Sequence, residues 1–129
     1  MLNREQVKEL TGWTDATLKR MMTMGKVDEY RDGFSPAELY RVSARAREAL
    51  EQLMQFTDEG EWWVKFWCWL VLEAAGLIEV EKPVHPATGL EYGREEWAVR
   101  LTSLGLEVAR ELDDLIEYHG LREEVKRKR

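Results

Sequence analysis

The stretch that decides the fold runs from residue 11 to residue 25 and reads TGWTDATLKRMMTMG. Gly12 ends any preceding helix, and Thr14 can cap a new one by accepting a hydrogen bond from an amide of its first turn. Leu18 and the two methionines at 21 and 22 share one face by helical spacing. The stretch therefore predicts a short helix that begins at Thr14 and ends at Gly25.

The opposite face of this predicted helix carries small and basic side chains, namely Ala16, Lys19, Arg20 and Thr23. A first helix is predicted over roughly Arg4 to Leu10, where Val7 and Leu10 lie three residues apart and can cover a core. Two short helices joined by a tight turn that contains glycine form a helix-turn-helix, whose second helix enters the major groove of DNA.

The tetrapeptide Ser35-Pro36-Ala37-Glu38 predicts the start of a third helix. Ser35 can cap it, Pro36 suits its first turn, and Glu38 can bond back to the cap residue. Apolar residues continue at helical spacing, so we expect one long helix that runs to about Phe56. Residues 26–34 lie between the second and third helices and are expected to form a small irregular wing. Residues 1–56 are thus predicted to be a helix-turn-helix module with a long third helix.

Residues 57–120 are predicted to form a winged-helix-like half made of a helix, a β-hairpin and a helix. A capped start at Asp58 leads into residues 62–72, which are apolar on nearly every side, so this Trp-rich helix must be buried on most faces. Alternating patterns predict strands at Leu77–Val80 and Trp97–Leu101, joined by a long turn-rich loop.

A last helix is capped by Thr102 or Ser103 and stops near Gly120, and residues 121–129 are expected to be a frayed basic tail. The predicted fold class is therefore mainly α.

Composition limits the class of protein. A chain of 129 residues with 44% hydrophobic residues is about one domain, or two modules that share a core. The single cysteine, Cys68, excludes an internal disulfide and a cysteine-based zinc set, and fits a reducing compartment. Neither a signal peptide nor a membrane-spanning stretch is recognisable, so we expect a cytoplasmic protein without a membrane partner.

Charge divides the chain into two unlike halves. Residues 1–56 hold nine Lys/Arg and nine Asp/Glu, whereas residues 57–129 hold ten against sixteen, so the net charge of −6 belongs to the second half. Without the terminal bases at 126–129, residues 57–125 carry six bases against sixteen acids. The surface of the second half is therefore expected to repel phosphate.

The quoted stretch, together with Gly25-Lys26-Val27 and Phe34-Ser35-Pro36-Ala37-Glu38-Leu39, resembles the MerR/excisionase pattern over about the first forty residues. The resemblance implies that the second helix contacts the major groove, that a wing touches the DNA backbone, and that Thr17, Lys19 and Arg20 are the contact positions. The sequence Tyr30-Arg31-Asp32-Gly33 differs in order from the family's Gly-Tyr-Arg wing.

The second half more loosely resembles PadR- and MarR-type winged helices. The resemblance lies in two short sequence segments, Ala75-Gly76-Leu77-Ile78 and Leu101-Thr102-Ser103-Leu104-Gly105.

These observations predict a sequence-specific, DNA-binding transcription regulator whose partner is double-stranded DNA. The candidate DNA-binding residues are Thr14, Ala16, Thr17, Lys19, Arg20, Thr23, Lys26, Arg31, Arg41 and Arg45. Of these, the third-helix arginines either neutralise phosphates or belong to a solvated face that Glu48 and Glu51 help to neutralise. One module buries roughly 600–1,000 Å² on DNA, so specific binding is expected to need a homodimer and a palindromic site.

The acidic balance favours an alternative: a factor, of the kind phages encode, that uses helix-turn-helix folds to bind a protein of the transcription machinery or a repressor. The contact would be carried by the acidic hairpin or by the Trp-rich helix, whose candidate interface residues are Trp62, Trp63, Phe66 and Trp67. For this tryptophan cluster, core packing or a dimer interface is favoured over base stacking or a ligand cage. His85 and His119 have no neighbours at metal-ligand spacing, and no nucleophile or phosphate-loop motif is present. We therefore expect no metal, no cofactor and no enzymatic activity.

Overall fold

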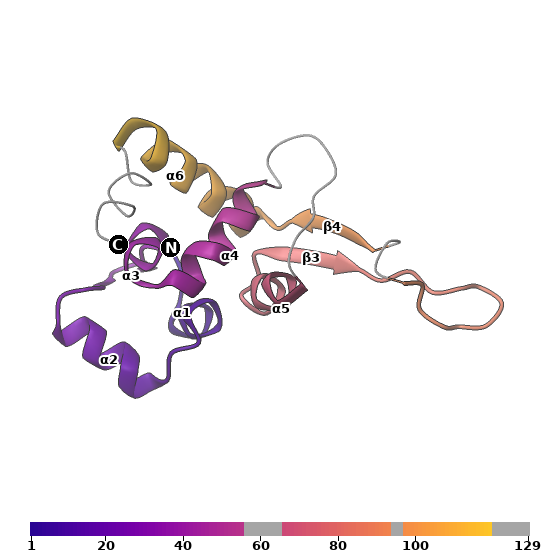
Figure 1. Cartoon of the computed structure of the whole chain (residues 1–129), viewed down its shortest axis with the longest axis horizontal. Coiled ribbons are helices and arrows are strands. Elements are labelled where there is room, and N and C mark those ends of the chain that lie inside the picture. The colour runs from indigo at the N-terminus through magenta and orange to yellow at the C-terminus, as the bar shows by residue number, and fades with distance from the viewer. Residues whose placement is uncertain (56–65, 94–96, 120–129) are drawn as a thin grey trace.

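The computed structural model describes residues 1–55, 66–93 and 97–119, and the side chains of Phe66 and of residues 117–119 lie outside that description. Within these ranges the chain is mainly helical, as predicted, with two small antiparallel strand pairs. The helices are α1 Arg4–Thr11, α2 Asp15–Thr23, α3 Pro36–Val42, α4 Ala44–Gln55, α5 Phe66–Ala74 and α6 Ser103–His119 (Figure 1). The strands are β1 Glu29–Tyr30, β2 Gly33–Phe34, β3 Ile78–Glu81 and β4 Ala98–Leu101.

Side-chain caps set the bounds of the first two helices. The Asn3 side chain accepts from the Gln6 amide at 2.9 Å, and the Gln6 side chain accepts from the Asn3 amide at 2.8 Å, so α1 begins with a capping box. It ends at Gly12, whose φ of +74° is a left-handed conformation that glycine adopts without strain. Thr14 caps α2 by accepting from the Thr17 amide at 3.2 Å, as predicted.

The third helix is broken where the sequence predicts that it continues. α3 and α4 are separated by Ser43, which adopts an extended conformation with φ −126° and ψ 113°. The Ser43 hydroxyl accepts a hydrogen bond from the Ala46 amide at 3.1 Å and so caps α4. The prediction of one long helix from Ser35 to about Phe56 is therefore wrong, because the serine hydroxyl competes for the backbone and starts a second helix.

The start of α3 also differs from the prediction. Pro36 occupies the first turn as expected, but the Ser35 side chain makes no cap hydrogen bond. The Glu38 carboxylate, instead of bonding back to Ser35, accepts from the Asp28 amide and from the Tyr30 hydroxyl, both at 2.9 Å. The predicted capping box is therefore absent, because Glu38 is engaged by the preceding hairpin.

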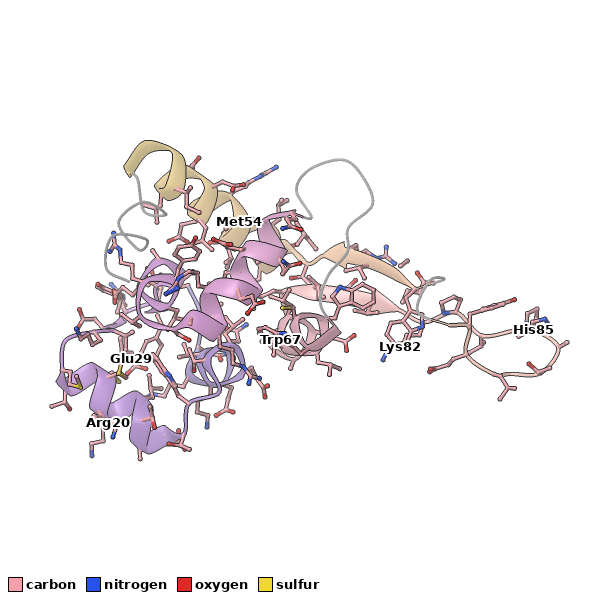
Figure 2. All side chains as sticks on the ribbon, viewed as in Figure 1. Arg20, Glu29, Met54, Trp67, Lys82 and His85 are labelled. Carbon is pink, nitrogen blue, oxygen red and sulfur yellow. The ribbon has the colours of Figure 1, made fainter. Side chains whose placement is uncertain are left out.

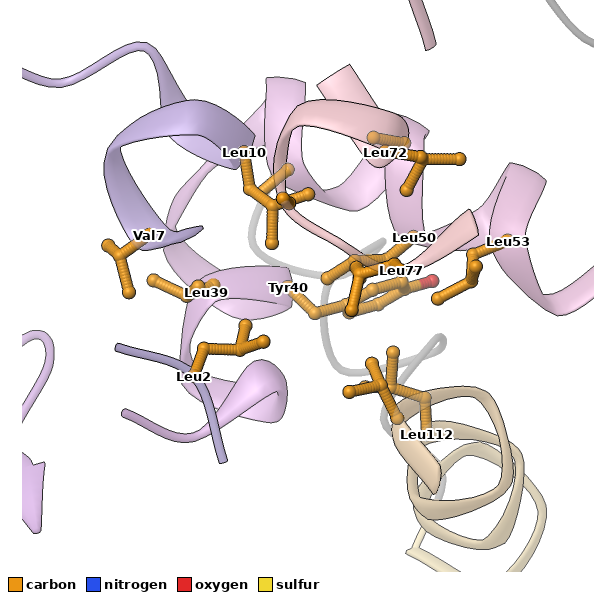
Figure 3. Packing of buried hydrophobic residues seen from close by; sticks show 14 of the residues in the cluster. Leu2, Val7, Leu10, Leu39, Tyr40, Leu50, Leu53, Leu72, Leu77 and Leu112 are labelled. Atoms are coloured by element: carbon orange, nitrogen blue, oxygen red, sulfur yellow. The ribbon is translucent and has the colours of Figure 1, made fainter. Parts of the chain in front are cut away.

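One hydrophobic cluster forms the interior and draws on both halves of the chain. Its buried members include Leu2, Val7, Leu10, Leu39, Tyr40 and Leu50 from the first half, and Leu72, Leu77 and Leu112 from the second (Figure 3). A polar contact crosses the same junction, since Gln6 Nε2 on α1 donates to the Ala75 carbonyl at 2.9 Å. Burial of apolar surface is the main stabilising contribution, so the two halves stabilise each other.

The Trp-rich helix is less buried than predicted. Cys68 and Leu72 are fully buried, whereas Leu70 is 50% exposed and Trp67 and Trp69 are half-buried. The expected start at Asp58 lies outside the described residues. In the described part of α5, the helix therefore packs on one side and presents the other to solvent.

Both strands of the second half form as predicted, displaced by one residue at their ends. β3 pairs antiparallel with β4 in a register that opposes Ile78 to Leu101 and Val80 to Val99. The connection continues this pairing beyond the strands, since Val84 forms an isolated bridge with Glu91. We call residues 82–93 the arm, which Figure 1 shows extending away from the helices.

α6 is fixed to the turn between α5 and β3. Thr102 accepts from the Gly105 amide at 3.0 Å and donates to the Gly76 carbonyl at 2.7 Å, which confirms Thr102 as the cap. A Cβ atom at Gly105 would overlap the carbonyl oxygen of Leu77, so the approach of α6 to this turn requires glycine. None of the helices in the described ranges is long and apolar enough to cross a bilayer.

Candidate nucleic-acid interface

α2 presents a basic, solvent-exposed face at the edge of the molecule. Leu18 is buried and the two methionines at 21 and 22 pack partly against the core, as the periodicity predicts. Lys19 and Arg20 are both exposed, as Figure 2 shows for Arg20, and neither forms an ion pair with any residue in the described ranges. Two unpaired cations on a rigid, capped helix are suited to contact an anionic partner.

The hydroxyl groups on α2 are engaged within the helix. The Thr14 hydroxyl accepts from the Thr17 amide and lies 3.1 Å from the Thr17 hydroxyl. Thr23 donates its hydroxyl proton to the Lys19 carbonyl at 3.0 Å. The polar groups that α2 can offer to a partner are therefore chiefly those of Lys19 and Arg20, with the methyl group of exposed Ala16 beside them.

The acidic residue on α2 is neutralised from α1. Lys8 Nζ lies 3.2 Å from the Asp15 carboxylate and 3.1 Å from the Glu5 carboxylate. Hydrogen bonds to Glu5 and then to Asp15 raise the pKa of Lys8 above its usual value, so the ammonium stays charged. Asp15 consequently opposes the basic face less than its formal charge indicates.

A second ion pair engages one carboxylate of the β1–β2 hairpin. Arg4 donates to Glu29 from Nε at 3.1 Å and from Nη2 at 3.0 Å, a two-point contact. The hydrogen bond from Arg4 lowers the pKa of the Glu29 carboxyl below its usual value. Lys26, which follows α2, and Arg31, at the turn of the hairpin, are exposed.

The exposed charges on α2 and the β1–β2 hairpin are balanced in number, but two of the carboxylates, Asp15 and Glu29, are paired with α1. Four cations have no ion pair within the described ranges: Lys19, Arg20, Lys26 and Arg31. Two exposed carboxylates in the same segment, Asp28 and Asp32, likewise lack a cationic partner there. Among the unpaired groups of this segment, cations therefore outnumber carboxylates by four to two.

The candidate arginines on α3 and α4 differ in their surroundings. Arg41 is exposed on α3. The Arg45 guanidinium lies over the Trp67 ring, 5.6 Å from its centroid, and a Cβ atom at Gly12 would lie 3.5 Å from Arg45 Nη1. Arg45 therefore links the end of α1 to α5 through a cation–π contact, and a phosphate would have to compete with that contact.

The interface candidates on the Trp-rich helix are only partly described. Trp62 and Trp63 lie outside the described residues, and so does the side chain of Phe66. Trp67 is half-buried beneath Arg45, whereas the neighbouring Trp69 lies 5.9 Å from Trp97, between ring centroids.

The arm carries three exposed apolar side chains. Val84 is 53% exposed, Leu90 is 70% exposed and Tyr92 is 38% exposed. His85, at the end of the arm in Figure 2, lies against Tyr92 with ring centroids 5.7 Å apart. No group of three potential metal-ligating side chains occurs among the described residues.

Comparison of the chain with protein-family models, with curated proteins and with solved structures finds no match.

Three residues of the site are not recognisable in the sequence. Arg4 and Lys8 neutralise carboxylates on α2 and the hairpin, and Glu38 binds the hairpin. Their partners lie seven to twenty-five residues away in sequence, across turns whose geometry no local pattern specifies. The one available signal was the pairing of opposite charges between predicted neighbouring helices.

Proposed function

We propose that this chain is a cytoplasmic, sequence-specific DNA-binding regulator of transcription. In this proposal α1 and α2 act as a helix-turn-helix, α2 enters the major groove, and the β1–β2 hairpin is a wing beside it. The observation that carries the proposal is the exposed, unpaired position of Lys19 and Arg20 on a capped helix whose opposite face is buried.

The charge distribution supports an anionic partner at this surface. Lys8 and Arg4 pair with two of the four carboxylates on α2 and the wing, so the unpaired cations there outnumber the unpaired carboxylates, Asp28 and Asp32, within the described ranges. A phosphate backbone is attracted by such a local excess even when the whole protein is acidic, because screening limits electrostatic reach to about 8–10 Å at physiological salt.

The two basic residues have different proposed roles. The Arg20 guanidinium presents a planar fork that matches the O6 and N7 acceptors of guanine. Lys19 is a point charge suited to a phosphate, and the Ala16 methyl group suits contact with a thymine methyl group. Arg20 is thus proposed to contribute to sequence preference, and Lys19 chiefly to affinity.

Specific binding is proposed to require two copies. A single small module buries roughly 600–1,000 Å² on DNA, and a two-fold dimer on a palindromic site doubles that contact. Sedimentation of the chain with a selected duplex measures this directly, and a one-to-one complex would contradict it.

The experiment that tests the function is a gel shift with a duplex selected from a random pool. Lys19→Ala combined with Arg20→Ala is expected to abolish the shift while the circular dichroism spectrum stays unchanged. A matched control removes two cations elsewhere, Lys82→Ala with Arg110→Ala, and should retain binding. Retained binding by the α2 double variant would refute the assignment.

A second candidate function is favoured by the arm, which exposes Val84, Leu90 and Tyr92 on an acidic half that should repel nucleic acid. Under this alternative the chain binds a protein, such as a component of the transcription machinery. Complex formation would then survive nuclease treatment and be lost on Leu90→Ser. The α2 double variant would form the complex as the wild-type chain does. A DNA affinity that falls steeply with salt would argue for the first candidate.

A further inference from the structure

Glu38 ties the β1–β2 hairpin to the first turn of α3 through both oxygens of one carboxylate. Oε1 accepts from the Asp28 amide at 2.9 Å, and Oε2 accepts from the Tyr30 hydroxyl at 2.9 Å. One contact lies just before β1 and the other lies within it, so the hairpin cannot rotate about its base without breaking one of them.

The same carboxylate stands where a capping box would use it. In a capping box the third helical residue bonds back to the amide of the cap residue, which here is Ser35. Glu38 reaches the hairpin instead, and Ser35 provides no side-chain cap. The start of α3 thus forgoes a local stabilisation while the hairpin gains a fixed position.

Further contacts hold the hairpin from the side of the N-terminus. Leu2 and Phe34 exchange two backbone hydrogen bonds, at 2.9 Å and 2.7 Å, and Arg4 holds Glu29. These contacts hold Glu29 in β1 and Phe34 in β2, whereas Glu38 holds Tyr30, the residue next to exposed Arg31. The hydrogen bond to Glu38, and then its charge, raise the pKa of Tyr30 above its usual value.

We propose that Glu38 is a positioning residue, which holds the β1–β2 hairpin so that Arg31 contacts a DNA phosphate beside α2. The inference rests on the proposed function. It assigns an acidic residue a favourable role in DNA binding, which a count of charges would not suggest.

The test compares two variants that remove the same charge. Glu38→Gln keeps an acceptor for the Asp28 amide and gains a donor for the Tyr30 hydroxyl oxygen, so the hairpin stays tied. Glu38→Ala removes both contacts. The measured quantity is the slope of log affinity against log salt for the selected duplex, which reports the number of phosphates contacted.

Glu38→Gln is expected to retain the wild-type slope, with equal or tighter binding. Glu38→Ala is expected to lose about one from the slope, because Arg31 no longer reaches a phosphate. Glu9→Ala, which removes an exposed carboxylate from α1, is the control and should leave the slope unchanged. An unchanged slope in Glu38→Ala, or an equal loss in both Glu38 variants, overturns the inference while the proposed function stands.

A second readout does not depend on DNA. The pKa of Tyr30, followed by NMR, is expected to fall when Glu38 is replaced by alanine. An unchanged pKa would show that Glu38 does not hold the Tyr30 hydroxyl. Tyr30→Phe removes one of the two contacts and is expected to lose part of the slope, which keeps the test valid if Glu38→Ala fails to fold. Should the wild-type chain bind no duplex, the proposed function fails, and the role of Glu38 in DNA contact fails with it.

Discussion

Arg4 and Glu29 form a two-point ion pair across 25 residues of sequence, with donor–acceptor distances of 3.1 Å and 3.0 Å. The pair connects the first turn of α1 to strand β1. Because both side chains are partly exposed, its main effect is to orient the hairpin, and it adds little to the free energy of unfolding.

The Arg4–Glu29 pair predicts a pH dependence in the acid range. The folded-state pKa of Glu29 lies below its unfolded value, so the stabilisation is fully present above the unfolded pKa and is lost as the pH falls through the folded pKa. Arg4→Ala should therefore lower the free energy of unfolding at neutral pH, and the difference from wild type should shrink towards zero in acid. Urea denaturation at several pH values measures it, and a constant difference would contradict the linkage.

The Lys8–Asp15 contact predicts opposite effects of two substitutions on DNA affinity. On the proposed function, Lys8→Ala leaves the Asp15 carboxylate without its cation and should weaken DNA binding severalfold. Asp15→Asn should tighten binding, and the same change should restore affinity in the Lys8→Ala background. Fluorescence anisotropy on the four combinations measures the coupling between the two residues, and purely additive effects would argue against it.

The shared core predicts a single unfolding transition. Leu50 is fully buried among residues of both halves, so Leu50→Ala should lower the free energy of unfolding by about 2–5 kcal/mol. Helix content by circular dichroism and tryptophan fluorescence should lose their signals at the same urea concentration. Two separate midpoints would show that the halves unfold independently.

Close approach of α6 to the α5–β3 turn predicts a large cost for one methyl group. Gly105→Ala would place its Cβ against the Leu77 carbonyl and should cost about 1–3 kcal/mol of stability or more. Gly89 on the arm has a φ of +71° and open space around it, so Gly89→Ala should cost only about 1 kcal/mol. Thermal unfolding of the two variants compares the stability cost of steric overlap at position 105 with that of backbone strain at position 89.

The helix caps predict a contrast between two similar substitutions. Asn3→Ala removes a capping box and should cost about 0.5–2 kcal/mol. Ser35→Ala should cost much less, because the Ser35 side chain makes no cap hydrogen bond. Equal losses in urea denaturation would mean that cap geometry does not decide stability at these positions.

Local patterns in the sequence were sufficient to predict most elements of the fold. The cap at Thr14, the buried side of α2 and the alternation of β4 all depend on neighbours within a few residues, and each prediction is confirmed. The capping box at Asn3 had the same kind of signal, an acceptor followed three residues later by glutamine, although it was not predicted.

Features that depend on tertiary contacts were not predictable in this way. The break at Ser43 competes with a hydrophobic pattern that continues across it, so periodicity alone favours one helix. Glu38 matches a capping motif but binds Asp28 and Tyr30, which approach it only after the chain has folded. The position of Arg45 in the helical pattern is that of a solvated side chain. Its contact with Trp67 arises only because α4 and α5 meet.

The exposed face of α2 was predictable from the sequence, but its electrostatic environment was not. Helical spacing alone directed Lys19 and Arg20 away from the core. The neutralisation of Asp15 by Lys8 depends on the angle at which α1 meets α2, and a linear sequence contains no local signal for that angle.

The hydrogen bond from Gln6 to the Ala75 carbonyl, together with the common interior, bears on how such a chain can evolve. A gene fragment that encoded only the first 55 residues would leave Leu10 and Leu50 without their apolar cover, and the product should aggregate. Recombination is therefore a poor route for moving the basic face of α2 to another protein. Its chemistry would change more readily by point substitution on the outer side of α2, where no side chain supports the interior.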